Sequence, residues 1–158
     1  MSDGRSFQQE RITDLWSEMT PLATAHQAEA GTHFPLKLNE DAYLAAQQNG
    51  SHLFHTARLN GQLVGYCSTL LSYSNHDGKL QAHEDGIYIL PEHRGWMGRD
   101  LEHYVDRVLM DAGCARSYRE RIIDPDHVDR STRRGPLGYK PMSILWVRDL
   151  VALKAEVA

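Results

Sequence analysis

The residue types best suited to chemistry in this 158-residue chain stand together in one short segment, from Pro91 to Leu101. Two glycines, Gly95 and Gly98, let the backbone approach a ligand closely, and two arginines beside them add positive charge. An amphipathic run follows, so the segment predicts the start of a helix, where free N–H groups and the helix dipole favour anions. The chemistry predicted for this turn is therefore phosphate binding.

Other reactive residue types do not form a second pattern. His52 and His55 lie three residues apart in a predicted strand, without the helical His-Glu-x-x-His spacing, so no metal site is predicted. Cys67 and Cys114 lack metal-ligand spacing and are expected to be reduced thiols. The chain also lacks a Gly-x-Ser-x-Gly turn, a Gly-Lys-Ser/Thr loop and a Gly-x-Gly-x-x-Gly fingerprint.

The elements that position the turn follow from periodicity. Apolar residues from Ile12 to His26 recur at helical spacing, and Thr20-Pro21 predicts that a second helix starts there. Asn39 predicts the N-cap of a short helix that ends at Asn49-Gly50. Asn60-Gly61 predicts a hairpin between strands at 52–59 and 62–73.

The second half of the chain predicts further strands around one helix. A strand at about 80–90 precedes the turn, and a helix with apolar steps of three and four follows it and ends near Gly113. Beyond it we expect a strand at 115–123, a weak helix or loop at about 126–134 and a last strand at 142–150. This order predicts an α/β fold with a mixed, mostly antiparallel central sheet and flanking helices.

Composition is that of a single globular domain covering residues 1–158, with 41% hydrophobic and 24% charged residues. No apolar run approaches the roughly 20 residues of a membrane span, and the N-terminus has no signal-peptide core, so a cytoplasmic protein is expected. The net charge of −4 argues against nucleic-acid binding. The basic excess within 116–148 is either a solvated face or a patch for a phosphate-bearing cofactor or an acidic partner.

The chain resembles the GNAT superfamily of N-acetyltransferases. The resemblance rests on Pro-Glu-His-Arg-Gly-x-x-Gly-x-x-Leu at 91–101 with the helix behind it, on Leu-Gly-Tyr-Lys-Pro at 137–141, and on Asn60 to Gly65 leading into a long strand. Small phage-encoded acetyltransferases look most similar. The resemblance implies the GNAT fold, acetyl-CoA as cofactor, an amine acceptor and, in some arrangements, a homodimer.

The resemblance also implies where the cofactor binds. The strand before the turn would line the pantetheine, and the turn with the helix start would wrap the pyrophosphate. In this sequence the first group is Ile87, Tyr88, Ile89 and Leu90, and the second is Arg94, Gly95, Trp96, Met97, Gly98 and Arg99. Two registers of the family motif stay open: in one Trp96 replaces a glycine, and in the other Met97 and Arg99 do.

Catalysis needs a neutral amine, and a base provides it. The resemblance suggests Glu84, early on the cofactor strand, and His127, in the loop after the fifth strand, as the candidate bases. The general acid is Tyr88, Tyr118, a water or no group at all. The resemblance implies that the N-terminal helices and the loops around 31–38 and 72–79 form the acceptor groove.

Two functions follow as hypotheses. The first is an acetyl-CoA-dependent N-acetyltransferase that acts on a primary amine of a small molecule or protein by direct attack in a ternary complex. The alternative is a catalytically degenerate GNAT-like fold that senses acyl-CoA or binds a protein.

Overall fold

A five-stranded sheet forms the centre of the computed structural model, which describes residues 4–30 and 36–119. The strands lie in the order β1-β2-β3-β4-β5, antiparallel from β1 to β4 and parallel between β4 and β5. Their bounds are β1 (Arg5–Gln9), β2 (His52–Leu59), β3 (Gln62–Tyr73), β4 (Leu80–Ile89) and β5 (Arg116–Tyr118). This mixed, mostly antiparallel sheet confirms the predicted fold class.

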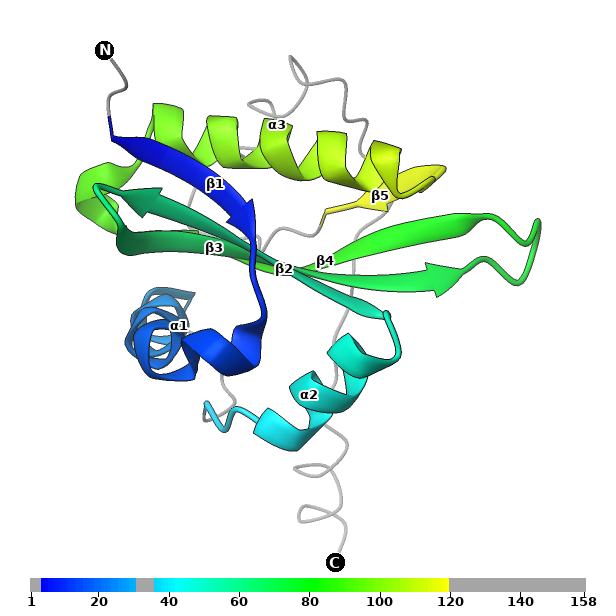
Figure 1. The fold of residues 1–158 in the computed structure, drawn as a ribbon, viewed down its shortest axis with the longest axis horizontal. Helices are drawn as coiled ribbons and strands as arrows, with labels where there is room; N and C mark the ends of the chain where they lie inside the picture. The colour runs from blue at the N-terminus through cyan, green and yellow to red at the C-terminus, as the bar shows by residue number, and fades with distance from the viewer. Residues whose placement is uncertain (1–3, 31–35, 120–158) are drawn as a thin grey trace, which may run out of the picture. The chain divides into compact units, whose positions relative to one another are not determined.

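Helices cover both faces of the sheet, with α1 and α2 on one side and α3 on the other (Figure 1). The helical elements are η1 (Ile12–Leu15), α1 (Trp16–Ala30), α2 (Glu40–Gln48), η2 (Pro91–His93) and α3 (Trp96–Asp111). Each face has its own apolar core, one built around Phe54 and Tyr66 under α1, the other around Val64 and Leu101 under α3. The β3–β4 hairpin extends past the helices (Figure 1).

Local sequence signals account for several of these elements. Asn60 and Gly61 both have positive φ, 50° and 85°, as a two-residue type I′ hairpin turn requires. The Asn39 side chain accepts a hydrogen bond from the Ala42 backbone N–H at 3.1 Å and caps α2. The predicted bounds of β2 and β3 are therefore confirmed.

One prediction for the N-terminal region is wrong, and one strand there was not predicted. Residues 5–9 form the edge strand β1, which no prediction included, and α1 continues through Pro21. Proline removes one intrahelical hydrogen bond, but Met19, Leu22 and Ala23 are buried along one face of the continuous helix, and this burial outweighs the local stop signal. The elements predicted after residue 119 lie outside the described residues.

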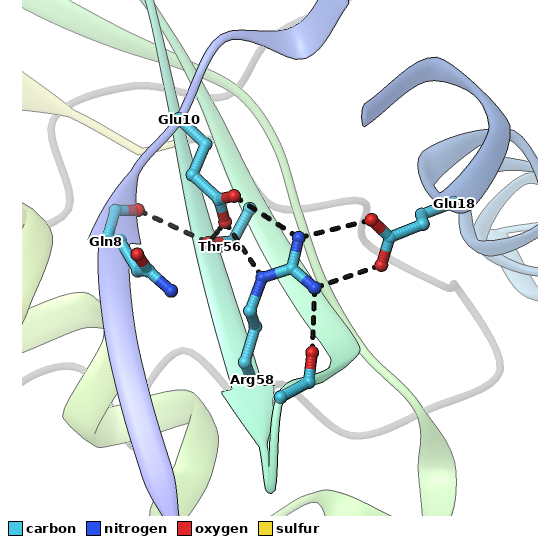
Figure 2. A network of polar contacts seen from close by, with 6 residues as sticks. Gln8, Glu10, Glu18, Thr56 and Arg58 are labelled. Atoms are coloured by element: carbon cyan, nitrogen blue, oxygen red, sulfur yellow. Dashed lines mark hydrogen bonds and ion pairs between the residues drawn. The ribbon is translucent and has the colours of Figure 1, made fainter. Parts of the chain in front are cut away.

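An ion-pair network fastens α1 and the start of the chain to the sheet, as Figure 2 shows. Arg58 on β2 donates from Nε to Glu10 Oε2 at 3.0 Å and from Nη1 to Glu18 Oε2 at 2.9 Å. Thr56 also donates to Glu10. Burial acts to raise the pKa of Glu10, but the hydrogen bonds from Arg58 and Thr56 outweigh it and lower the pKa. The network fixes the position from which α1 reaches β4.

Candidate active site

One edge of β4 is open over half of its length. β4 pairs with β3 through Ile89 but with β5 only at positions 81–83, opposite Arg116–Tyr118. Among the described residues no strand pairs with this edge from 84 to 89. Leu90 N–H bonds to Val64 on β3, so the Ile89 carbonyl of the same peptide unit faces the open edge. The edge from 84 to 89 can therefore offer backbone groups to a ligand with an amide-bearing arm, and the Ile89 carbonyl oxygen there also accepts a hydrogen bond from Arg94.

The predicted pyrophosphate residues form the turn at the end of this edge. Gly95 has φ 96°, in the region that favours glycine, and it precedes α3 without a side-chain cap. No acidic residue lies in the first turn of α3, so its free N–H groups are uncompensated. Met97 is buried under the helix, whereas Trp96 is 66% exposed with the Arg99 guanidinium carbon 3.9 Å from its ring centroid.

Arg94 leans back onto the β4 edge. Its Nε donates to the Ile89 carbonyl oxygen at 3.0 Å, and its Nη1 donates to Glu29 Oε1 of α1 at 2.7 Å. The guanidinium carbon lies 5.5 Å from the centroid of the Tyr88 ring. The cation therefore links α1 to the end of β4, beside the turn where the sequence predicted phosphate contacts.

A β-bulge in β4 decides which side chains face α1 and α2. Glu84 pairs with Thr69 and Gly86 pairs with Ser68, so Asp85 is the extra residue. Strict alternation would put Asp85 and Tyr88 on opposite faces, because three positions separate them. The bulge brings both to the face covered by α1 and α2, while Glu84 stays on the α3 face.

Asp85 is the exposed end of a polar network on that face. Its Oδ2 accepts a hydrogen bond from Ser68 Oγ at 2.9 Å and one from the Tyr43 hydroxyl at 3.4 Å. Ser68 Oγ lies 2.8 Å from His52 Nε2. Burial raises the pKa of Tyr43 to about 12 and lowers the pKa of His52, so the phenol is protonated and the imidazole neutral near pH 7.

An aromatic wall from α1 borders the same area. The His26 ring stacks on the Tyr88 ring at 4.9 Å between centroids, and His26 Nδ1 lies 2.8 Å from the Tyr66 hydroxyl. A Cβ at Gly86 would lie 3.4 Å from His26 Cε1, so the imidazole lies directly against this glycine. Burial lowers the pKa of His26.

The predicted base Glu84 has a different environment. On the α3 face its Oε2 pairs with Arg119 Nη1 at 2.8 Å, and Arg119 also pairs with Asp106 of α3 at 2.6 Å. The Glu84 side chain is 6% exposed and that of Arg119 2%. His127, the other predicted base, lies outside the described residues. The structure therefore does not bring Glu84 to the face where Asp85 and the aromatic wall meet.

An open hollow lies beside the region where β4 pairs with β5. It is lined by hairpin residues 72–76, by Gln81 and His83 of β4, and by Arg116 and Tyr118 of β5. The His83 and Tyr118 rings stack at 4.8 Å, and Arg116 pairs with Asp77. Part of the predicted acceptor loop at 72–79 thus borders this hollow. His83, which also lines it, lies two residues before Asp85 on β4.

The described part of the chain has neither a candidate metal centre nor a candidate membrane span. No group of three or more His, Cys, Asp or Glu residues there could hold a metal ion. None of its helices combines the length and the apolar character that a bilayer crossing requires. Both cysteines are free, and burial raises the pKa of the Cys67 thiol to about 12.

The family model described as Acetyltransferase (GNAT) family matches residues 10–121. The chain belongs to the GNAT family. The matched segment contains every described element from η1 to β5, including the open edge of β4 and the turn before α3. No curated protein sequence matches the chain.

Solved structures of GNAT-type enzymes share this fold. A ribosomal-protein-alanine N-acetyltransferase from Brucella melitensis biovar Abortus 2308 matches with a TM-score of 0.72 and 16% identity over 93% of this chain and 99% of its own. Glucosamine-6-phosphate N-acetyltransferase from Arabidopsis thaliana gives 0.68 and 10% over 92% and 98%. The aminoglycoside acetyltransferase meta-AAC0020 from an uncultured soil metagenomic sample gives 0.67 and 16% over 94% and 95%. At these identities the likeness concerns the fold.

Proposed function

We propose that this GNAT protein, as one domain over residues 1–158, is an acetyl-CoA-dependent N-acetyltransferase. It would move an acetyl group to a primary amine of a small molecule or protein by direct attack in a ternary complex. The observation that carries the proposal is the open edge of β4, which ends at the uncapped N-terminus of α3.

The residues present fit acetyl-CoA. The free edge at 84–89 suits the amide groups of pantetheine, and Ile87 to Leu90 supply its strand. The N–H groups at the start of α3 suit pyrophosphate, helped by Gly95 and Arg99. When bound, acetyl-CoA supplies an activated acetyl group as a thioester.

Asp85 is the base that we favour for the amine. It is exposed, and it lies on the face that carries His26 and Tyr88. Proton removal by a positioned side chain is typically worth about 10²- to 10⁴-fold in rate. Glu84 and His127, the bases suggested by the sequence, remain rival candidates, but the Glu84 carboxylate is buried against Arg119.

The acceptor is proposed to enter from the hollow beside the β3–β4 hairpin. Its lining combines aromatic rings with hydroxyl, amide and imidazole groups. Such a lining suits a polar acceptor with a hydrophobic portion, and it would bring an amine along β4 toward Asp85.

The test is a three-variant panel assayed for CoA release with acetyl-CoA and a range of amines. We expect Asp85→Asn to lower kcat/KM about 100-fold or more, with unchanged acetyl-CoA affinity by calorimetry. Glu84→Gln should instead lower the melting temperature, because it removes the charge of one of the two carboxylates that pair with the buried Arg119. Loss of turnover in Glu84→Gln or His127→Asn at unchanged stability, with Asp85→Asn active, would reassign the base.

A noncatalytic acyl-CoA sensor is the second candidate, favoured by the engagement of Arg94 with Glu29. It predicts tight acetyl-CoA binding without CoA release for any amine in the panel. Turnover with any amine would exclude it.

A further inference from the structure

Three side chains from three neighbouring strands form one hydrogen-bonded chain on the face covered by α1 and α2. His52 of β2 reaches Ser68 of β3, with 2.8 Å from Nε2 to Oγ, and Ser68 reaches Asp85 of β4, with 2.9 Å from Oγ to Oδ2. His52 is 2% exposed and Ser68 3%, whereas Asp85 is exposed. The chain therefore runs from the interior to a carboxylate that a substrate can reach.

The direction of the hydrogen bonds follows from chemistry. An ionised carboxylate only accepts, so the single hydroxyl proton of Ser68 points to Asp85. The hydroxyl oxygen then accepts from His52, which must carry its proton on Nε2. His52 Nδ1 is buried and has no partner among the described residues, which is tolerable for a bare lone pair and costly for an N–H group.

We propose that His52 and Ser68 are positioning residues that hold Asp85 in the orientation in which it takes the proton of the incoming amine. This inference rests on the proposed function. Both described donors to Asp85, Ser68 and Tyr43, bind Oδ2. No described residue bonds to Oδ1, so this oxygen is the one that receives the proton.

The titratable groups that face Asp85 support this arrangement. They are Tyr43 from α2, His52 from β2 and Tyr66 from β3, with His26 of α1 against the adjacent Gly86. Burial raises the pKa of both tyrosines and lowers the pKa of both histidines, so all four are neutral near pH 7. The carboxylate thus stands among neutral hydrogen-bonding groups.

The protein supplies a matched control for the relay, which is the hydrogen-bonded set of His52, Ser68 and Asp85. His55 lies on the same strand three residues away and is also fully buried, but it faces α3 and neither ring nitrogen has a partner among the described residues. Replacing His55 removes a buried imidazole without touching Asp85. A general packing effect would therefore appear in both histidine variants, and a relay effect only in one.

The first experiment needs no acceptor. Long-range ¹H–¹⁵N NMR of the imidazoles at pH 7 should show His52 as the Nε2–H tautomer in the full-length protein. Ser68→Ala should mix the two tautomers of His52. A wild-type His52 with its proton on Nδ1 would overturn the proposal, because Ser68 would then donate to His52 and leave Asp85.

The second experiment uses kinetics with the best amine of the panel. We expect Ser68→Ala and His52→Leu to lower kcat about 10-fold or more, since each weakens a hydrogen bond to a charged group. KM for acetyl-CoA should not change, because neither side chain lies on the open edge of β4 or at the start of α3. His52→Gln, which keeps an N–H donor, should recover most of the activity.

The variants separate the two proposals. If Asp85→Asn loses activity but Ser68→Ala and His52→Leu behave like His55→Leu, the relay is wrong and the proposed base stands. If Asp85→Asn is fully active, the proposed base fails, and the relay fails with it.

Discussion

His55 gives a prediction about acid stability. Its side chain is 0% exposed on the α3 face of β2, beside the Tyr104 ring at 5.9 Å between centroids, and both ring nitrogens lack partners among the described residues. Burial lowers the pKa of His55 to about 4 from an ordinary 6.5, because charging the imidazole in the core is costly. Between pH 6.5 and pH 4, therefore, His55 binds a proton in the unfolded chain but not in the folded one.

This difference in pKa determines how the free energy of unfolding changes with pH. With the folded pKa below the unfolded one, the stabilisation is complete above pH 6.5 and falls as the pH drops toward 4. The full effect is about 3 kcal/mol, and about 2 kcal/mol of it is lost between pH 7 and pH 5. His26 and His52, whose pKa values burial also lowers, add to the slope of the wild type, so the comparison must be with a variant.

The assay is urea unfolding at pH 7, 6 and 5, followed by far-UV circular dichroism. His55→Leu should lose about 2 kcal/mol less than the wild type between pH 7 and pH 5, whatever its stability at pH 7. Cys67→Ala is the control: it changes the cross-strand partner of His55, and a thiol whose pKa burial raises to about 12 does not titrate there. Equal slopes for wild type and His55→Leu would refute the reasoning.

Two further predictions concern the end of β4. A Cβ at Gly65 would lie 2.7 Å from the Tyr88 carbonyl oxygen, so Gly65→Ala should destabilise the fold by about 2 kcal/mol in urea unfolding. Gly98→Ala is the control and should not destabilise the fold, because a Cβ there makes only ordinary contacts. A Gly65→Ala variant as stable as the wild type would contradict the close approach of β3 and β4. Glu29→Gln removes the carboxylate that pairs with Arg94 and should free the guanidinium for phosphate. The KM for acetyl-CoA should then fall about 2- to 5-fold, a size typical of an exposed ion pair. A higher KM would mean that Arg94 serves only to hold α1.

The predictable parts of the fold were those that short-range patterns specify. Asn60-Gly61 determined the hairpin and Asn39 the start of α2, because turn and cap chemistry depend on a few adjacent residues. β1 was missed because a polar five-residue edge strand has no apolar alternation, and its pairing with β2 is a long-range contact. Pro21 misled for the opposite reason: a strong local signal was overridden by packing.

The turn between β4 and α3 was predictable, but the side chains around Asp85 were not. Gly95 and the amphipathic helix carry their signal in adjacent residues. The network joins His52, Ser68 and Asp85 from three strands, and its geometry depends on the register of β2, β3 and β4. Nothing local distinguishes Asp85 from Glu84, so a sequence pattern cannot show which of the two adjacent acids faces α1 and α2.

The bulge gives these two acids different environments. Glu84 faces α3, where Arg119 and Asp106 join it in ion pairs that tie β4 to the helix and to the residue that follows β5. A carboxylate held in this way stabilises the strand, and protonating it would sacrifice a buried ion pair. Asp85 faces the other side with Oδ2 held and Oδ1 left open, so taking a proton there breaks no ion pair. One extra residue in β4 therefore separates an acid suited to holding the strand from an acid suited to proton transfer.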